Sequence, residues 1–172
     1  MMMMMLKAGG MDVLTDNIRR ADEDNPKGYY EFERVKEIEH DKTWLPLAEG
    51  KAVKVISALL KHLPDDHHYK VIFMQRKLKE ILASQRQMLV RRGEDPDAVS
   101  DERIAEVSRR HLQQVKNWLS AQPHMEVLYV HYNDVLNDPQ GQAVRISYFL
   151  DQRVDPERMA QAVDRGLYRQ RG

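Results

Sequence analysis

Residues 71–84, VIFMQRKLKEILAS, contain the change of pattern that decides the fold. Their first four residues belong to an apolar, β-rich run at residues 69–74, which is typical of a strand buried on both faces. Leu78, Ile81 and Leu82 then recur at helical spacing. A buried strand followed directly by a helix is the beginning of a βαβ unit, so this stretch predicts a parallel sheet.

Two further apolar runs, residues 52–56 and 126–132, have the same character, and we predict that both are strands. A helical pattern at residues 104–119 precedes the last run, and Ser100 is a suitable N-cap for that helix. Strands that alternate with helices predict a three-layer α/β fold with a mainly parallel sheet. A single domain of this kind suits the whole chain of 172 residues.

The ends of three more helices can be recognised. Residues 1–8 are an unbroken run of mainly helix-forming residues, which Gly9 and Gly10 end. Asp138-Pro139 and Asp155-Pro156 each place a capping carboxylate before a proline at the first helical position. We therefore predict one helix at the start of the chain and two near its end.

The composition indicates a globular chain and excludes several classes of function. Hydrophobic residues make up 42% and charged residues 31%. The 27 basic and 27 acidic residues give a net charge of zero, which argues against extensive binding of nucleic acid. The absence of cysteine excludes disulfides, thiolate metal sites and cysteine nucleophiles. No apolar run approaches the ~18 residues of a membrane span, and residues 1–5 lack the features of a signal peptide, so we expect no membrane association. We also expect a cytoplasmic location, with which the absence of cysteine is compatible.

The residues that follow each predicted strand are the first candidates for a ligand site, because ligands of parallel sheets bind beyond the carboxyl ends of the strands. These residues are Ser57, residues 75–77 and residues 131–134. Arg76 offers a planar fork of donors to a phosphate, and Ser84 in the following helix adds a hydroxyl. An arginine at a strand end can equally be a solvated or structural charge, so the residues alone leave both readings open.

Three segments resemble the sulfotransferase family. Residues 71–84 resemble the family segment in which a strand ends in Arg and the next helix supplies Ser eight positions later. Residues 127–139 (VLYVHYNDVLNDP) resemble its strand, Tyr-Glu-Asp-Leu turn and Asp-Pro cap, with Asn133 where Glu is common and Asp134 retained. Residues 24–33 (DNPKGYYEFE) resemble a segment of bacterial sulfotransferase-like proteins.

This resemblance implies a P-loop-type fold and a reaction. The reaction is transfer of a sulfuryl group from 3′-phosphoadenosine 5′-phosphosulfate to a hydroxyl or amine acceptor, and it requires no metal. In the family, the arginine and the serine hold the 3′-phosphate of the donor, which implies this role for Arg76 and Ser84. A histidine or an acid often takes the acceptor's proton. Glu31, His40 and His62 are the candidates here, and each also fits a solvated surface position.

The sequence departs from the family pattern at its beginning. Family members open with a strand, a loop of the type Gly-x-Pro-Arg-Ser-Gly-Thr-Ser and a helix, and the loop's backbone N–H groups bind the 5′-phosphosulfate. Residues 1–6 correspond to that helix after its first turn. We therefore expect an N-terminally truncated chain that lacks the first strand and the loop. Such a chain would have impaired activity and would tend to self-associate through an unpaired sheet edge.

Two alternative functions remain open at this stage. One is a non-catalytic module that binds nucleotides or proteins through the same fold. The other is a P-loop kinase or NTPase relative, which would need a Walker lysine and a magnesium carboxylate. Asp134 is the only nearby acid at a strand end. The acceptor cannot be specified from the residues.

Other polar clusters are assigned no function. His67 and His68 precede a strand, and no carboxylate beyond Asp65 and Asp66 has ligand spacing, so we interpret them as a solvated loop rather than a metal site. Residues 109–111 (Arg-Arg-His) are interpreted as the exposed face of the long helix.

Overall fold

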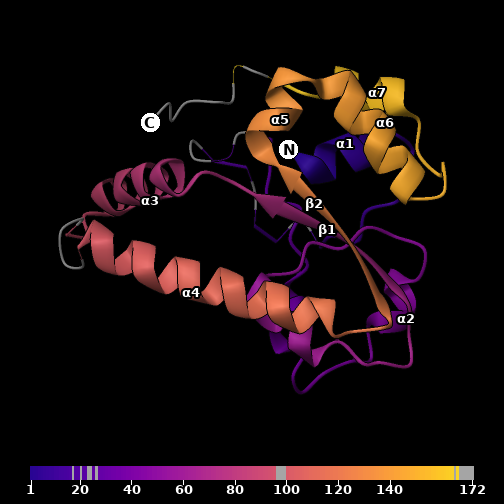
Figure 1. Cartoon of the computed structure of the whole chain (residues 1–172), viewed down its shortest axis with the longest axis horizontal. Helices are drawn as coiled ribbons and strands as arrows, with labels where there is room; N and C mark the ends of the chain where they lie inside the picture. Colours follow the sequence, from indigo (N-terminus) through magenta and orange to yellow (C-terminus); the bar gives the residue numbers. More distant parts are fainter. Residues whose placement is uncertain are drawn as a thin grey trace.

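The computed structural model of the chain (Figure 1) combines short 3-10 segments, two strands and seven α-helices among the residues that it describes. It describes residues 1–16, 18–19, 21–22, 25, 27–95, 100–164 and 166. In chain order the elements are α1 (Met2–Ala8), the 3-10 helix η1 (Glu33–Glu37), α2 (Leu45–Ala48), the 3-10 helix η2 (Ser57–His62), β1 (Tyr69–Gln75), α3 (Leu78–Arg92), α4 (Asp101–Ser120), β2 (Met125–His131), α5 (Tyr132–Asn137), α6 (Pro139–Phe149) and α7 (Pro156–Gln161).

The two strands β1 and β2 pair in parallel. Tyr69 lies opposite Met125 at one end, and Gln75 lies opposite His131 at the other. The helices α3 and α4 form the connection between the strands, as a parallel pair requires. The predicted strands at residues 69–74 and 126–132 and their parallel pairing are therefore confirmed, except that Tyr132 begins α5 instead of ending the strand.

The predicted strand at residues 52–56 is wrong. In the described part of the chain this segment forms only an isolated bridge between Ala52 and Val13. Val53 and Val55 are half-buried because they pack on the cluster around Trp44, and Ile56 is 57% exposed. The apolar residues of this segment are therefore explained by packing of an extended chain. The segment lacks the hydrogen-bonded neighbour that a strand needs.

Side chains that alternate along the strands face two different helical layers. On one face, Ile72, Met74, Leu128 and Val130 pack against a core formed with α1, α5, α6 and α7. On the other face, the strand residues pack against α4 and η2; they are Tyr69, Val71, Phe73, Met125 and Val127. Figure 1 shows α1 and α5–α7 above the strands and α4 below them, so the sheet is the middle of three layers.

Local capping explains where several helices begin. Asp138 Oδ1 accepts a hydrogen bond of 2.9 Å from Gly141 N, and Asp155 Oδ1 accepts one of 2.9 Å from Glu157 N. Ser100 Oγ accepts a hydrogen bond of 3.3 Å from Arg103 N. These bonds satisfy backbone donors that have no partner inside the helix, so the predicted starts of α4, α6 and α7 are confirmed.

The first helix is buried, and Gly9 lies at its closest contact with α7. Met5 is fully buried, and a Cβ atom at Gly9 would lie 2.6 Å from Cγ of Met159 in α7. A side chain at position 9 would therefore force Met159 or its neighbours to shift, so glycine suits the close approach of α1 to α7. The predicted helix at residues 1–8 is thus confirmed, whereas the expected self-association through a sheet edge stays a prediction.

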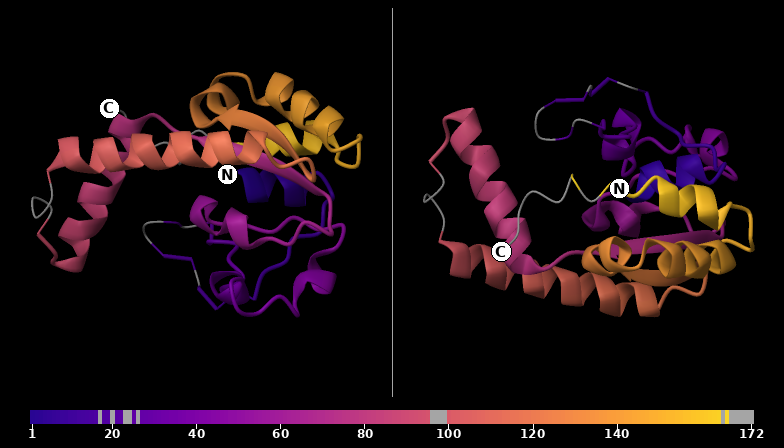
Figure 2. Two further views of the ribbon diagram at one scale, coloured as in Figure 1. Left: turned by 60° about the horizontal axis from the view of Figure 1, so that its bottom comes forward. Right: turned by 90° about the horizontal axis from the view of Figure 1, so that it is seen from above.

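The helix α3 and the first turns of α4 project from the rest of the molecule, as both views of Figure 2 show, whereas the last turns of α4 pack against the sheet. Gly93, with φ of 72°, ends α3 in the left-handed conformation. Among the described residues, no helix combines the length and the apolar character that crossing a membrane requires.

Candidate functional site

The carboxyl ends of β1 and β2 lie side by side. Gln75 and His131 are register partners at the last position of the sheet. Arg76 therefore leaves the sheet next to residues 132–134, which form the first turn of α5. Two of the three segments expected to surround a ligand site thus meet at one edge.

Arg76 is held by a buried carboxylate. Its Nε donates a hydrogen bond of 3.0 Å to Oε2 of Glu80, in the first turn of α3. The side chain of Glu80 is 2% exposed, whereas that of Arg76 is 27% exposed. The arginine thus uses one of its five donors on Glu80 and reaches solvent at the sheet edge.

Glu80 also joins the two strand ends. Its Oε1 accepts a hydrogen bond of 2.9 Å from Nδ2 of Asn133 in α5. The guanidinium carbon of Arg76 lies 5.0 Å from the ring centre of Tyr132, within cation–π range. We call Arg76, Glu80, Tyr132 and Asn133 the strand-end cluster. Glu80 was not among the predicted site residues, although its position four residues after Arg76 is a usable signal.

Two more polar groups adjoin the cluster. Ser84 is half-buried in α3, and its spacing of four from Glu80 puts it on the same side of that helix. At the end of β1, Nε2 of Gln75 is buried and has no hydrogen-bond partner in the part of the chain that the structure describes. A buried donor of this kind calls for an acceptor, such as a ligand oxygen or a water molecule.

Residues 33–169 match the family model of the sulfotransferase domain, a range that covers well over half of the chain. The chain belongs to the sulfotransferase family. No curated protein and no solved structure matches it. The matched range of this sulfotransferase-family chain contains the whole strand-end cluster and Ser84, whereas α1 lies before it.

Glu31, a candidate proton acceptor in this sulfotransferase-family chain, is engaged in ion pairs. Its Oε1 lies 3.0 Å from Nζ of Lys54 and 3.4 Å from Nη1 of Arg19. Burial alone would raise the pKa of Glu31, but the hydrogen bond and charge of Lys54 and the charge of Arg19 outweigh it, so this pKa lies below its ordinary value of 4.5. Glu31 is consequently ionised at neutral pH and is a weak base.

The structure does not bring the two histidine candidates to the strand-end cluster. His62 lies 3.8 Å from Oε2 of Glu39, at the end of η2. The nearby Pro64 carbonyl accepts a hydrogen bond of 3.0 Å from Tyr69 at the start of β1. Arg76 follows the other end of that strand, about 23 Å away at about 3.3 Å per residue. His40 is exposed in the turn after η1.

Ser57, the third expected strand-end residue, contacts a different partner. Its Oγ lies 2.9 Å from Nε2 of His111 in α4. His111 is half-buried, so the interpretation of residues 109–111 as an exposed face is wrong at this position. Because Ser57 begins η2, this hydrogen bond joins η2 to the long helix.

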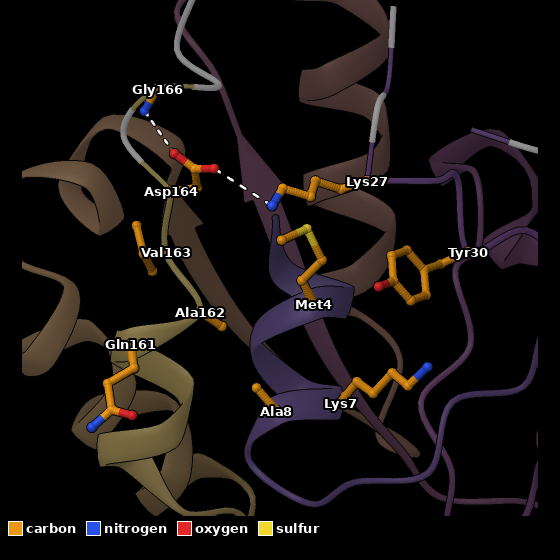
Figure 3. Close-up of a pocket in the computed structure, with 10 residues that line it drawn as sticks. All are labelled: Met4, Lys7, Ala8, Lys27, Tyr30, Gln161, Ala162, Val163, Asp164 and Gly166. Carbon is orange, nitrogen blue, oxygen red and sulfur yellow. Dashed lines mark hydrogen bonds and ion pairs between the residues drawn. The ribbon is translucent and has the colours of Figure 1, made fainter. Parts of the chain in front are cut away.

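A separate cavity of about 930 Å³ lies between α1, the turn at residues 27–30 and the end of α7 (Figure 3). Among the lining residues, Nζ of Lys27 lies 3.7 Å from Oδ2 of Asp164, and Nζ of Lys7 lies 5.9 Å from the ring centre of Tyr30. Its lining includes no member of the strand-end cluster. Within the described ranges, no group of three or more acidic or histidine side chains is arranged to hold a metal ion.

Proposed function

We propose that this sulfotransferase-family chain uses 3′-phosphoadenosine 5′-phosphosulfate as its donor and acts on a small hydroxyl or amine acceptor. Arg76 and Ser84 would bind the 3′-phosphate of the donor. The observation that carries this proposal is the position of Arg76. It leaves β1 at the carboxyl edge of a parallel sheet, where such folds bind ligands, and it is partly exposed there.

The chemistry of the edge fits a phosphate. The Arg76 guanidinium can donate charge-assisted hydrogen bonds, each of which contributes about 1.5–3 kcal/mol. Ser84 lies on the same side of α3 as Glu80, and the buried Nε2 of Gln75 offers another donor at the end of β1. Arginine, hydroxyl and amide donors are suited to the several oxygens of a phosphate group.

The transfer itself concerns the other end of the donor. The acceptor atom forms a bond to sulfur while the bond from sulfur to the bridging phosphate oxygen breaks, and the acceptor loses a proton. Glu31, His40 and His62 stay proposals for the group that receives this proton. These 172 residues contain no Gly-x-Pro-Arg-Ser-Gly-Thr stretch, so we expect slow turnover by this chain alone.

Calorimetric titration with adenosine 3′,5′-bisphosphate tests the proposal. We expect the wild-type chain to bind this product and Arg76→Ala to abolish the binding. The matched control is Arg109→Ala, which removes an exposed arginine of α4 and should leave the affinity unchanged. Equal affinity of the Arg76→Ala and wild-type chains would refute the assignment.

A radiolabelled donor distinguishes the two forms of the function. Transfer of label to a mixture of phenol and amine acceptors would support an active sulfotransferase. Binding of the bisphosphate without any transfer would favour the second candidate, a nucleotide-binding module that has kept the phosphate site without turnover.

A further inference from the structure

Glu80 carries a charge in a place where charges are costly. Its side chain is 2% exposed, and a buried carboxylate is tolerated only when its oxygens accept good hydrogen bonds. Both oxygens have donors here, because Oε2 accepts from Arg76 and Oε1 accepts from Asn133. The carboxylate is therefore a fixed link between the ends of β1 and β2.

We propose that Glu80 is the positioning residue for Arg76 and that Asn133 holds Glu80 in the required orientation. This inference rests on the proposed function, since it deepens the account of the phosphate site. An arginine side chain at a strand end has several rotatable bonds and loses conformational freedom when it binds. Glu80 fixes the Nε edge of the guanidinium before any ligand arrives, and the Tyr132 ring lies beside the guanidinium.

The identity of residue 133 follows from the same contact. Asparagine donates from Nδ2 to the Glu80 carboxylate, whereas an ionised acid can only accept. A glutamate at this position, as is common in the family's Tyr-Glu-Asp turn, would set a second carboxylate against Glu80. Asn133 thus supplies Oε1 of the buried acid at position 80 with a donor that an ionised acid could not supply.

Two effects of Glu80 on anion binding have opposite signs. Its negative charge weakens the attraction of Arg76 for a phosphate, because the pair is neutral overall. Its hydrogen bond removes much of the entropy that Arg76 would otherwise lose on binding. A Glu80→Met variant separates these effects, because it keeps the volume and removes both the charge and the acceptor. If Glu80 acts mainly by positioning Arg76, this variant should bind the phosphate more weakly. If Glu80 acts only through its charge, the variant should bind the phosphate more tightly.

The experiment compares adenosine 3′,5′-bisphosphate with adenosine 5′-monophosphate by calorimetry on the full chain. For Glu80→Met we expect at least tenfold weaker binding of the bisphosphate and unchanged binding of the monophosphate, which lacks the 3′-phosphate. Asn133→Asp should cause a similar selective loss. The double variant Glu80→Gln with Asn133→Asp should restore the affinity to within threefold. In that variant the amide at position 80 can donate to the new carboxylate at position 133 and still accept from Arg76.

The possible failures are distinguishable. Wild-type binding that Arg76→Ala abolishes and Glu80→Met leaves equal or strengthens would overturn the positioning role and keep the proposed function. A wild-type chain that does not bind the bisphosphate would overturn the proposed function, and the inference with it. If Glu80→Met does not fold, the comparison of Asn133→Asp with the double variant decides, since failure of the second substitution to restore binding refutes the inference.

Discussion

Two arginine–carboxylate pairs in this chain differ mainly in burial. Arg34 donates to Oδ2 of Asp41 from Nη2 at 2.7 Å and from Nε at 3.1 Å, but both side chains are well exposed, at 42% and 34%. Arg76 makes a longer contact of 3.0 Å, with a Glu80 side chain that is 2% exposed. The Arg34–Asp41 contact is the shorter one, but water screens it more strongly. The distance alone therefore does not show which pair contributes more to stability.

The two pairs also connect different parts of the molecule. Asp41 further accepts hydrogen bonds from the backbone N–H and the hydroxyl of Thr43, so its contacts fix a local turn before α2. Glu80 reaches Asn133, which is 53 positions away in the sequence. The comparison indicates that the exposed pair shapes a turn, while the buried pair joins two strand ends that could form a site.

The largest expected effect is the difference in stability between two alanine variants, one that removes the carboxylate of Glu80 and one that removes that of Asp41. We expect Glu80→Ala to lower the free energy of unfolding by about 1–3 kcal/mol, because the donors of Arg76 and Asn133 lose their acceptor. The value is below that for a fully buried pair, since Arg76 is partly solvated. Asp41→Ala should cost much less. Urea unfolding of both variants measures the difference, and equal losses would contradict the ranking by burial.

A smaller effect concerns the pH dependence of the exposed pair. Hydrogen bonds from Arg34 and Thr43 lower the pKa of Asp41 from 3.8 to about 2. The folded state therefore keeps this carboxylate charged where the unfolded chain already binds a proton, so the stabilisation is complete above about pH 5 and is lost as the pH falls towards 2. The melting temperatures of wild type and Asp41→Asn should converge over this range. A difference in melting temperature that stays constant from pH 6 to pH 2 would show that the lowered pKa of Asp41 does not stabilise the fold.

The smallest effect is expected at a purely helical surface pair. Glu106 in α4 contacts Arg103 at 3.0 Å and also pairs with Arg110, and its side chain is 51% exposed. Replacement by glutamine should change the free energy of unfolding by less than about 0.5 kcal/mol. Urea unfolding again provides the measurement. A loss as large as that of Glu80→Ala would show that burial is not the deciding variable.

Part of the site could be read from the sequence because it depends on local order. Arg76 follows a strand and precedes a helix, and that order places it at the carboxyl edge of any parallel sheet. The role of Glu80 was missed because a carboxylate on a helix reads as a solvated charge until its burial is known. Likewise, the contact of Ser57 with His111 joins segments that no local pattern relates.

The sequence by itself determined β1, β2, the helices α1, α3, α4, α6 and α7, and the caps of α4, α6 and α7, because apolar periodicity and capping chemistry act between residues close in the chain. It also determined the family, through motifs within residues 33–169. Only the tertiary structure decided that residues 52–56 form no strand and that Glu80 is buried between Arg76 and Asn133. Strand pairing and burial depend on neighbours brought together by folding, and those neighbours are distant in the sequence.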